Sequence, residues 1–158
     1  MGISSRKAFS LIELMMVIAI ISVLSAVVLT SLSSARERSA NASIKSNLSS
    51  VRGMIALYYD TNSNYGTASV NGCASGGMFN ATTPHDISGA ISQALAQSGH
   101  TGGVYCRSNV TTNQWAIAIP LRPLTGNTAT QKGWCIDYRG VSKQIIFNSS
   151  NFSTSQCP

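Results

Sequence analysis

The chain has 158 residues, of which 44% are hydrophobic, and a formal net charge of +6 at pH 7. This length allows one modest domain plus an anchor. After residue 32 the chain is rich in Ser, Thr, Asn and Gly and poor in charge, which is unusual for a cytosolic protein. A positive net charge can attract nucleic acid, but the Lys and Arg residues are dispersed along the chain without a run. Nucleic acid is therefore not favoured as a partner.

Near the N-terminus, residues 14–35 form a run of 22 residues without a charge. About 20 apolar residues are enough for a helix to cross a membrane. The acid Glu13 lies just before this run, and the cations Arg6 and Lys7 precede it. A carboxylate at the edge of an apolar span is costly at the bilayer centre and usually has a partner, so Glu13 is expected to do more than anchor the chain.

The segment Lys7-Ala8-Phe9-Ser10-Leu11-Ile12-Glu13 resembles the N-terminus of type IV pilins and of the related type II secretion pseudopilins. In that family a short basic leader ends in a small residue, followed by Phe-Thr/Ser-Leu-Ile-Glu and an apolar helix. The resemblance implies that a prepilin peptidase cuts between Ala8 and Phe9 and that the new amine of Phe9 is methylated. It also implies that Glu13 pairs with the amino end of a neighbouring subunit's Phe9.

Three positions depart from the family pattern. Ala8 and Ser22 stand where glycine is usual or frequent, and Thr30 replaces a common proline. Because proline kinks a helix, the helix expected here is straighter. A secretory signal cut after Ala35 is the rival interpretation, but 22 uncharged residues exceed the roughly 7 to 15 of a signal core.

A second periodic pattern follows the apolar run. It consists of apolar residues and a tyrosine at spacings of four and three, typical of one face of a helix: Ile44, Leu48, Val51, Ile55 and Tyr58. With no proline before Pro84, one helix is expected from about Phe9 to Asp60, about 78 Å long. The helix should end within residues 60–66. Tyr58, Tyr59 and Tyr65 are expected to pack around this end of the helix.

The chain is expected to consist of three parts. Residues 1–8 are a leader, residues 9–35 are a transmembrane or filament-core segment, and residues 36–158 are a globular head that includes the second half of the helix. In the head, residues 67–84 are expected to form a loop. Asp86 is expected to cap a helix that ends before Gly99. Strands are expected at 103–107, 114–119, 132–138 and 141–147, with a tight turn at Arg139-Gly140 and a polar tail from 148 to 158.

The four cysteines all follow the apolar run, and none is in a Cys-x-x-Cys pair. This spacing argues against zinc and favours two disulfides formed in an oxidising compartment. Three pairings are open, of which chain order favours Cys73 with Cys106 and Cys135 with Cys157.

Residues that would support catalysis do not cluster in the sequence. His85 and His100 are the two histidines, and the acids are far apart: Glu13, Glu37, Asp60, Asp86 and Asp137. Asp137, before a turn, is interpreted as a turn residue rather than a metal ligand. We expect no catalytic residues, no metal, no cofactor and no enzymatic activity.

These features predict an α+β fold in which a long N-terminal helix packs on a small antiparallel sheet of three or four strands. The resemblance implies a filament subunit assembled from a membrane-held pool, with the leader in the cytoplasm and the head outside it. The implied partners are copies of the chain, other pilin-like subunits, the prepilin peptidase, the membrane and an inner-membrane assembly platform. The alternative is a membrane-anchored extracellular binding module that does not polymerise.

Overall fold

The structure is a computed structural model that describes residues 9–67, 73, 76–80, 86–101, 103–124, 127, 130–152 and 154–158. The predicted leader, His85 and most of the predicted loop over 67–84 lie outside the described residues. The chain divides into two compact units, Met1–Arg36 and Glu37–Pro158.

The long helix α1 spans Leu11–Asn62, which agrees with the prediction to within two residues at each end. From residue 9 to residue 29 every side chain is exposed. In the second unit, one face of α1 is buried and carries the predicted stripe of Ile44, Leu48, Val51 and Ile55. The same helix therefore has an apolar surface in one unit and an amphipathic pattern in the other.

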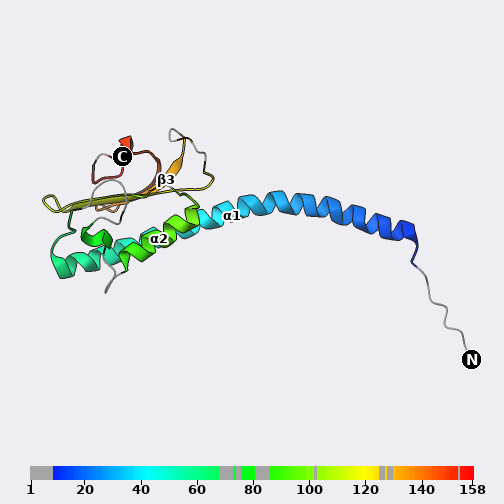
Figure 1. Ribbon diagram of the computed structural model, residues 1–158, viewed down its shortest axis with the longest axis horizontal. Helices are drawn as coiled ribbons and strands as arrows, with labels where there is room; N and C mark the ends of the chain where they lie inside the picture. Colours follow the sequence, from blue (N-terminus) through cyan, green and yellow to red (C-terminus); the bar gives the residue numbers. More distant parts are fainter. Residues whose placement is uncertain are drawn as a thin grey trace, which may run out of the picture. The chain divides into compact units, whose positions relative to one another are not determined.

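The second unit contains an antiparallel sheet of four strands in the order β1-β2-β3-β4. The strands are Tyr105–Asn109, Gln114–Pro120, Lys132–Asp137 and Ser142–Ile146. The helix α2, Ile87–Ser98, lies beside the C-terminal part of α1 on one side of this sheet (Figure 1). The predicted α+β class is confirmed: a long N-terminal helix is combined with a small antiparallel sheet.

Both ends of α2 follow the predicted capping chemistry. Asp86 accepts a hydrogen bond from the backbone N–H of Gly89, at 2.8 Å, and Gly99 ends the helix in the left-handed conformation with φ 68°. Strand β1 begins and ends two residues later than predicted. It continues to Asn109 because that residue pairs with Gln114, and its side-chain oxygen accepts the N–H groups that start the turn.

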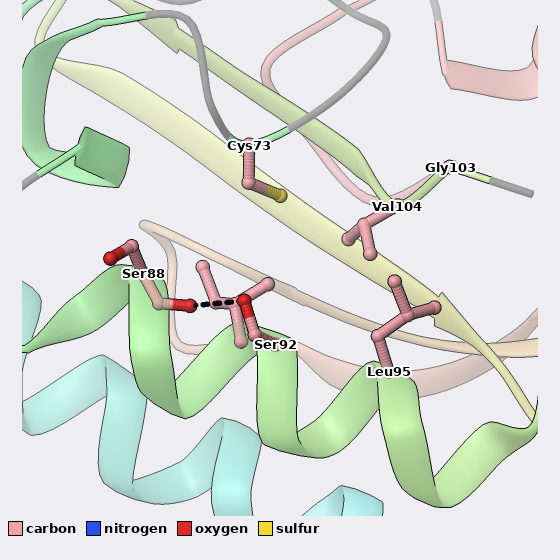
Figure 2. A pocket seen from close by; sticks show the side chains of 7 residues that line it. Cys73, Ser88, Ser92, Leu95, Gly103 and Val104 are labelled. Atoms are coloured by element: carbon pink, nitrogen blue, oxygen red, sulfur yellow. Dashed lines mark hydrogen bonds between the residues drawn. The ribbon is translucent and has the colours of Figure 1, made fainter.

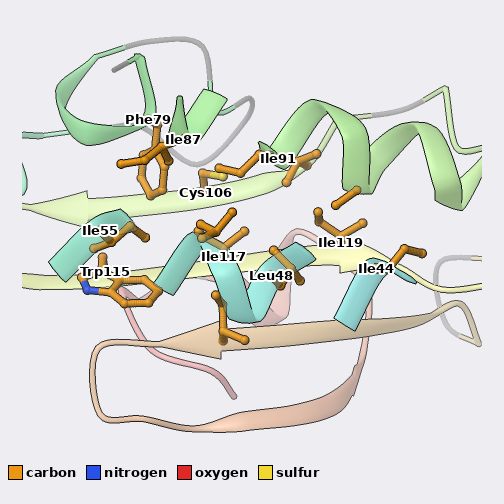
Figure 3. Packing of buried hydrophobic residues seen from close by; sticks show 14 of the residues in the cluster. Ile44, Leu48, Ile55, Phe79, Ile87, Ile91, Cys106, Trp115, Ile117 and Ile119 are labelled. Carbon is orange, nitrogen blue, oxygen red and sulfur yellow. The ribbon is translucent and has the colours of Figure 1, made fainter. Parts of the chain in front are cut away.

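The main core lies between the helices and the sheet. It joins the α1 stripe to Ile87 and Ile91 of α2 and to Trp115, Ile117 and Ile119, which alternate along β2 (Figure 3). A short 3-10 helix, Gly77–Asn80, adds Met78 and Phe79. That element falls inside the segment predicted to be a loop, because four residues are too few to show a periodic pattern.

The opposite face of the sheet has a second, smaller core. Ala116 and Ala118 of β2 and Cys135 of β3 are covered by Phe147, Phe152 and Cys157. The tail therefore contributes buried residues, including Phe152 of the 3-10 helix Ser150–Phe152. Strand β2 is therefore buried on both faces.

Candidate functional site

The beginning of α1 brings together two residues of the recognised motif. Ser10 precedes the helix, and its carbonyl accepts the N–H groups of Glu13 and Leu14 at 3.1 and 3.3 Å. The Glu13 carboxylate in turn accepts the N–H of Ser10 at 2.9 Å. This is the glutamate half of a capping box, in which a Ser or Thr is followed three residues later by Glu or Gln. The Ser-x-x-Glu spacing was the sequence signal that could have predicted it.

Phe9, to which the resemblance assigns the methylated amine, is 79% exposed and precedes the helix. Ala8, on the other side of the expected cleavage site, lies outside the described residues. Glu13 is in the first helical turn, where a negative charge interacts favourably with the helix dipole. The described end of α1 therefore consists of an exposed Phe9, a capped helix start and one acid.

The surface that follows is apolar around the whole helix. Large side chains between Leu11 and Leu29 are 46–74% exposed. The hydroxyl of Ser22 donates to the carbonyl of Ile18 at 2.7 Å, so this polar group is satisfied inside the helix. Within the described residues, α1 is the one helix that is long and apolar enough to cross a membrane.

In the second unit, the turn between β3 and β4 holds a buried acid. The Asp137 carboxylate is fully buried and accepts hydrogen bonds from the N–H groups of Arg139, Val141 and Cys157, at 3.0 to 3.2 Å. The Arg139 guanidinium donates to it at 2.7 Å. Asp137 is thus a turn residue that also holds the C-terminal tail, and the second role had no signal in the sequence.

The pKa of the Asp137 carboxyl reflects opposed causes. Burial raises this pKa, because it disfavours the charged form. The Arg139 side chain and the N–H groups of Cys157 and Arg139 together outweigh burial by stabilising the carboxylate, so the pKa is lowered overall. The acid is therefore charged at neutral pH and stabilises the turn and the tail together.

A cation from α1 also binds this turn. Arg52 donates to the carbonyls of Gly140, at 3.1 Å, and of Val141, at 2.6 Å. Gly140 has φ 84°, a left-handed conformation that glycine adopts without strain, and its N–H donates to the carbonyl of Asp137. Residues 138–141 connect β3 to β4, so the connection is longer than the predicted Arg139-Gly140 turn.

Two disulfides are present, Cys73–Cys106 and Cys135–Cys157, with Cα atoms 5.2 and 5.8 Å apart. These are the pairs that chain order favours. Cys135 is fully buried, and its disulfide bond to Cys157 holds the tail against the face of the sheet that carries the second, smaller core. The N–H of Cys157 also donates to Asp137, so this end of the tail has both a covalent and a polar attachment.

Among the described residues, one further surface feature is a small hollow beside α2. A hollow of about 210 Å³ lies between α2 and the start of β1, where Ser88, Ser92 and Leu95 face Cys73 and Val104 (Figure 2). The Ser92 hydroxyl donates to the Ser88 carbonyl, so the proton of this hydroxyl already has a hydrogen-bond acceptor within α2.

The predicted packing of tyrosines at the end of α1 is present. Tyr59 lies 4.7 Å from Tyr65, and Tyr65 lies 6.4 Å from Trp115, between ring centroids. Tyr58 is partly buried and packs against the main core.

Acids and histidines are not brought together in the part of the chain that the structure describes. No group of three His, Cys, Asp or Glu residues that could hold a metal occurs there. The rings of His100 and Phe147 pack in a T-shaped arrangement, with centroids 5.9 Å apart.

The long N-terminal helix and the four-stranded antiparallel sheet form an α+β, pilin-like architecture, and the helix is long and apolar enough to cross a membrane. Residues 3–29 match the family model described as the prokaryotic N-terminal methylation motif, which is the prepilin-type motif of type IV pilins and pseudopilins. No match to the chain was found among curated proteins or among solved structures. The match covers 27 of the 158 residues, so it shows a prepilin-type motif in the N-terminal part of the chain.

Proposed function

We propose that the chain is a structural subunit, a pilin or pseudopilin, of a type IV pilus-like or type II secretion filament that is assembled from a membrane-held pool. The observation that carries this proposal is the exposed apolar surface of residues 11–29 on a helix that bears the methylation motif. Such a surface must be covered by lipid or by other apolar helices. A subunit can pass from one cover to the other without exposing the surface to water.

The first step is processing at the membrane. A prepilin peptidase removes residues 1–8 on the cytoplasmic side, and the new amine of Phe9 is methylated. Residues 9–35 remain in the membrane, and residues 36–158 form the head outside the cytoplasm. The two disulfides support this placement of the head, because disulfides persist in oxidising compartments.

The second step is assembly on an inner-membrane platform. Repetition of one head-to-tail contact between copies, or with other pilin-like subunits, produces an open filament. Residues 9–35 then form the filament core, where an unpaired carboxylate is strongly destabilising. Glu13 relieves this penalty by pairing with the amino group of a neighbour's Phe9, so that the pair selects the register of assembly.

The test is to shear filaments from cells, purify them and determine the N-terminal mass of the subunit. We expect filaments that contain the chain, with an N-terminus at methylated Phe9. A start at Arg36 would contradict processing at Ala8–Phe9. An uncleaved span together with free monomer after detergent extraction would instead indicate the membrane-anchored binding module. Replacing Ala8 by a bulky residue should leave precursor in the membrane.

A further inference from the structure

We propose that the outer edge of β4 is a docking site for an extended, acidic segment of another protein, which adds to the sheet as a further strand. β4 is the last strand in the order β1-β2-β3-β4, so it pairs with β3 on one side only. A strand at the edge of a sheet presents a row of unpaired N–H and C=O groups, and an extended peptide can bind to such a row through its main chain.

Two hydrogen bonds at the ends of the β3–β4 ladder determine which backbone groups of β4 point outward. The N–H of Asp137 donates to the carbonyl of Val141 at 3.2 Å, and the N–H of Phe147 donates to the carbonyl of Gln131 at 2.7 Å. Hydrogen-bonded and non-hydrogen-bonded pairs alternate along an antiparallel ladder, so the odd-numbered residues of β4 are bonded to β3. The N–H and C=O groups of the even-numbered residues therefore point away from the sheet.

These even-numbered residues, Ser142, Gln144 and Ile146, are exposed. Within the described part of the chain, their backbone groups have no hydrogen bond to a segment outside the sheet. The strand at the other edge, β1, does have such a contact, because the hydroxyl of Ser108 donates to the carbonyl of Gly66 at 2.9 Å. The β4 edge is thus open to an added strand.

The charge around this edge determines the chemistry of the partner. From residue 87 to residue 158, Asp137 is the one acidic side chain, and it is buried and paired with a guanidinium group. The exposed cations Lys143 of β4 and Lys132, which is opposite Ile146, lie on the two faces of the sheet, because side chains alternate along a strand. An acidic segment added to β4 would therefore meet a lysine on either face.

The face that carries Ile146 also offers apolar contacts beside the edge. Ile146 is 48% exposed, and Trp134, opposite Gln144, is partly buried. Lys45 lies over the Trp134 ring, with its Nζ 4.4 Å from the ring centroid, and adds a further cation to this face. A segment in which apolar and acidic residues alternate can place its apolar side chains beside Ile146 and its acids beside Lys143.

A second copy of this chain and a nucleic acid fit the edge less well. The five acids of the chain lie far apart, so none of its segments is acidic. Pairing of two β4 strands would also bring two copies of Lys143 close together, and like charges across a strand pair are destabilising. A nucleic acid would meet the lysines through its phosphates, but it has no row of N–H and C=O groups to pair with the strand edge.

The test uses the full chain in detergent micelles and, as the probe, a synthetic peptide of about eight residues in which valine and glutamate alternate. We expect the probe to slow hydrogen exchange at the N–H groups of Ser142, Gln144 and Ile146, by about tenfold when nine-tenths of the sites are occupied. The N–H groups of Lys143 and Ile145 are the internal control, since they already face β3 and should change little.

Two methylated versions of the probe separate strand addition from charge attraction alone. When the glutamates lie beside Lys143, the valine N–H groups face β4 and the glutamate N–H groups point away from it. Methylation of the valine nitrogens should therefore abolish the protection, whereas methylation of the glutamate nitrogens should leave it nearly unchanged. A peptide with lysine in place of glutamate should not bind.

Variants of the protein test the same two features. Gln144→Pro removes one outward N–H without breaking a bond to β3, and should weaken binding of the probe about tenfold or more. Gln144→Ala retains this N–H and is the matched control, which should bind like the wild type. Lys143→Glu should weaken binding of the glutamate probe about three- to tenfold and should allow the lysine peptide to bind.

Four outcomes would overturn the inference. The first is that about 1 mM probe gives no protection of the three even-numbered residues. The second is equal binding of the two methylated probes, because strand addition uses alternate N–H groups only. The third is tighter binding of a single-stranded oligothymidylate than of the peptide, which would indicate a nucleic-acid surface. The fourth is protection without the probe that rises with protein concentration, which would indicate a second copy of the chain.

Discussion

The two halves of α1 differ in what their surroundings must supply. Between residues 11 and 29 each side chain is exposed, whereas four apolar residues of the later half are almost completely buried against the head. Both halves are continuous α-helix. The first half therefore presents an apolar surface, which the proposed function assigns to lipid or other subunits, while the second half is part of a domain core. Substitutions in the two halves should therefore fail in different assays.

The largest expected effect is on assembly and concerns Glu13. Glu13→Lys should insert in the membrane yet yield almost no sheared filaments, because it sets a cation against the neighbour's amine in an apolar core. The measurement is filament yield relative to the amount of subunit in the membrane. Glu37→Lys, the same exchange outside residues 9–35, should retain most of the yield. Wild-type yield from Glu13→Lys would contradict the pairing mechanism.

A pair of leucines from the same helix tests the comparison directly. Leu48→Ala should lower the free energy of unfolding of the head by about 2–5 kcal/mol, because Leu48 is fully buried and its loss leaves a cavity. Leu24→Ala, at a position 60% exposed, should leave it unchanged. Denaturation of the full chain in micelles, followed by tryptophan fluorescence, reports on the head, which contains both tryptophans. Equal losses would show that the halves are not distinct.

The disulfide of the tail should contribute less than the largest core substitutions. Cys135–Cys157 closes a loop of 22 residues, for which the chain-entropy model gives about 3 kcal/mol. Replacing both cysteines by alanine should release the tail and leave α1 helical, as measured by hydrogen exchange. Peptide mapping without reduction should recover Cys73–Cys106 and Cys135–Cys157. A crossed pair would contradict the assignment.

Acid should weaken the attachment at Asp137. Because the pKa of Asp137 is lowered in the folded chain, its contribution to stability is present above the unfolded pKa, about 4, and is lost as pH falls through the lower folded value. Asp137→Asn should cost about 1–3 kcal/mol at neutral pH, since it removes a charged acceptor of buried donors. It should also flatten the acid limb below about pH 4 in unfolding measurements. An unchanged acid limb would show that other carboxyls dominate it.

The smallest expected effect is a gain at Gly53. A Cβ at this exposed helical position would contact nothing within 4 Å, so Gly53→Ala should stabilise the head by about 1 kcal/mol. Gly133→Ala is the control, because there a Cβ would lie 2.8 Å from a ring atom of Phe147 and 3.1 Å from the Ile119 carbonyl. That variant should be destabilised. A loss of stability in Gly53→Ala would indicate that the face of α1 that carries Gly53 is packed against other residues.

The sequence by itself determined those features that depend on neighbours along the chain. The uncharged run of 22 residues, the spacing of Ile44, Leu48, Val51 and Ile55, and the caps Asp86 and Gly99 are each contained in one continuous segment. The prepilin-type motif is also a local pattern, and it was recognised from seven residues. In each case the physical signal and the structure that it produces share the same segment.

Only the tertiary structure decided which distant segments meet. No local pattern around Ala116 and Ala118 indicated that Phe147 and Phe152 would cover them. Likewise, nothing near Asp137 in the sequence indicated that its carboxylate would accept a hydrogen bond from the N–H of Cys157. Arg52 could not be assigned to a turn 88 residues further along the chain. Such contacts depend on how the sheet brings its strands and tail together in space. A linear pattern records the chemistry of each partner and not the identity of the other.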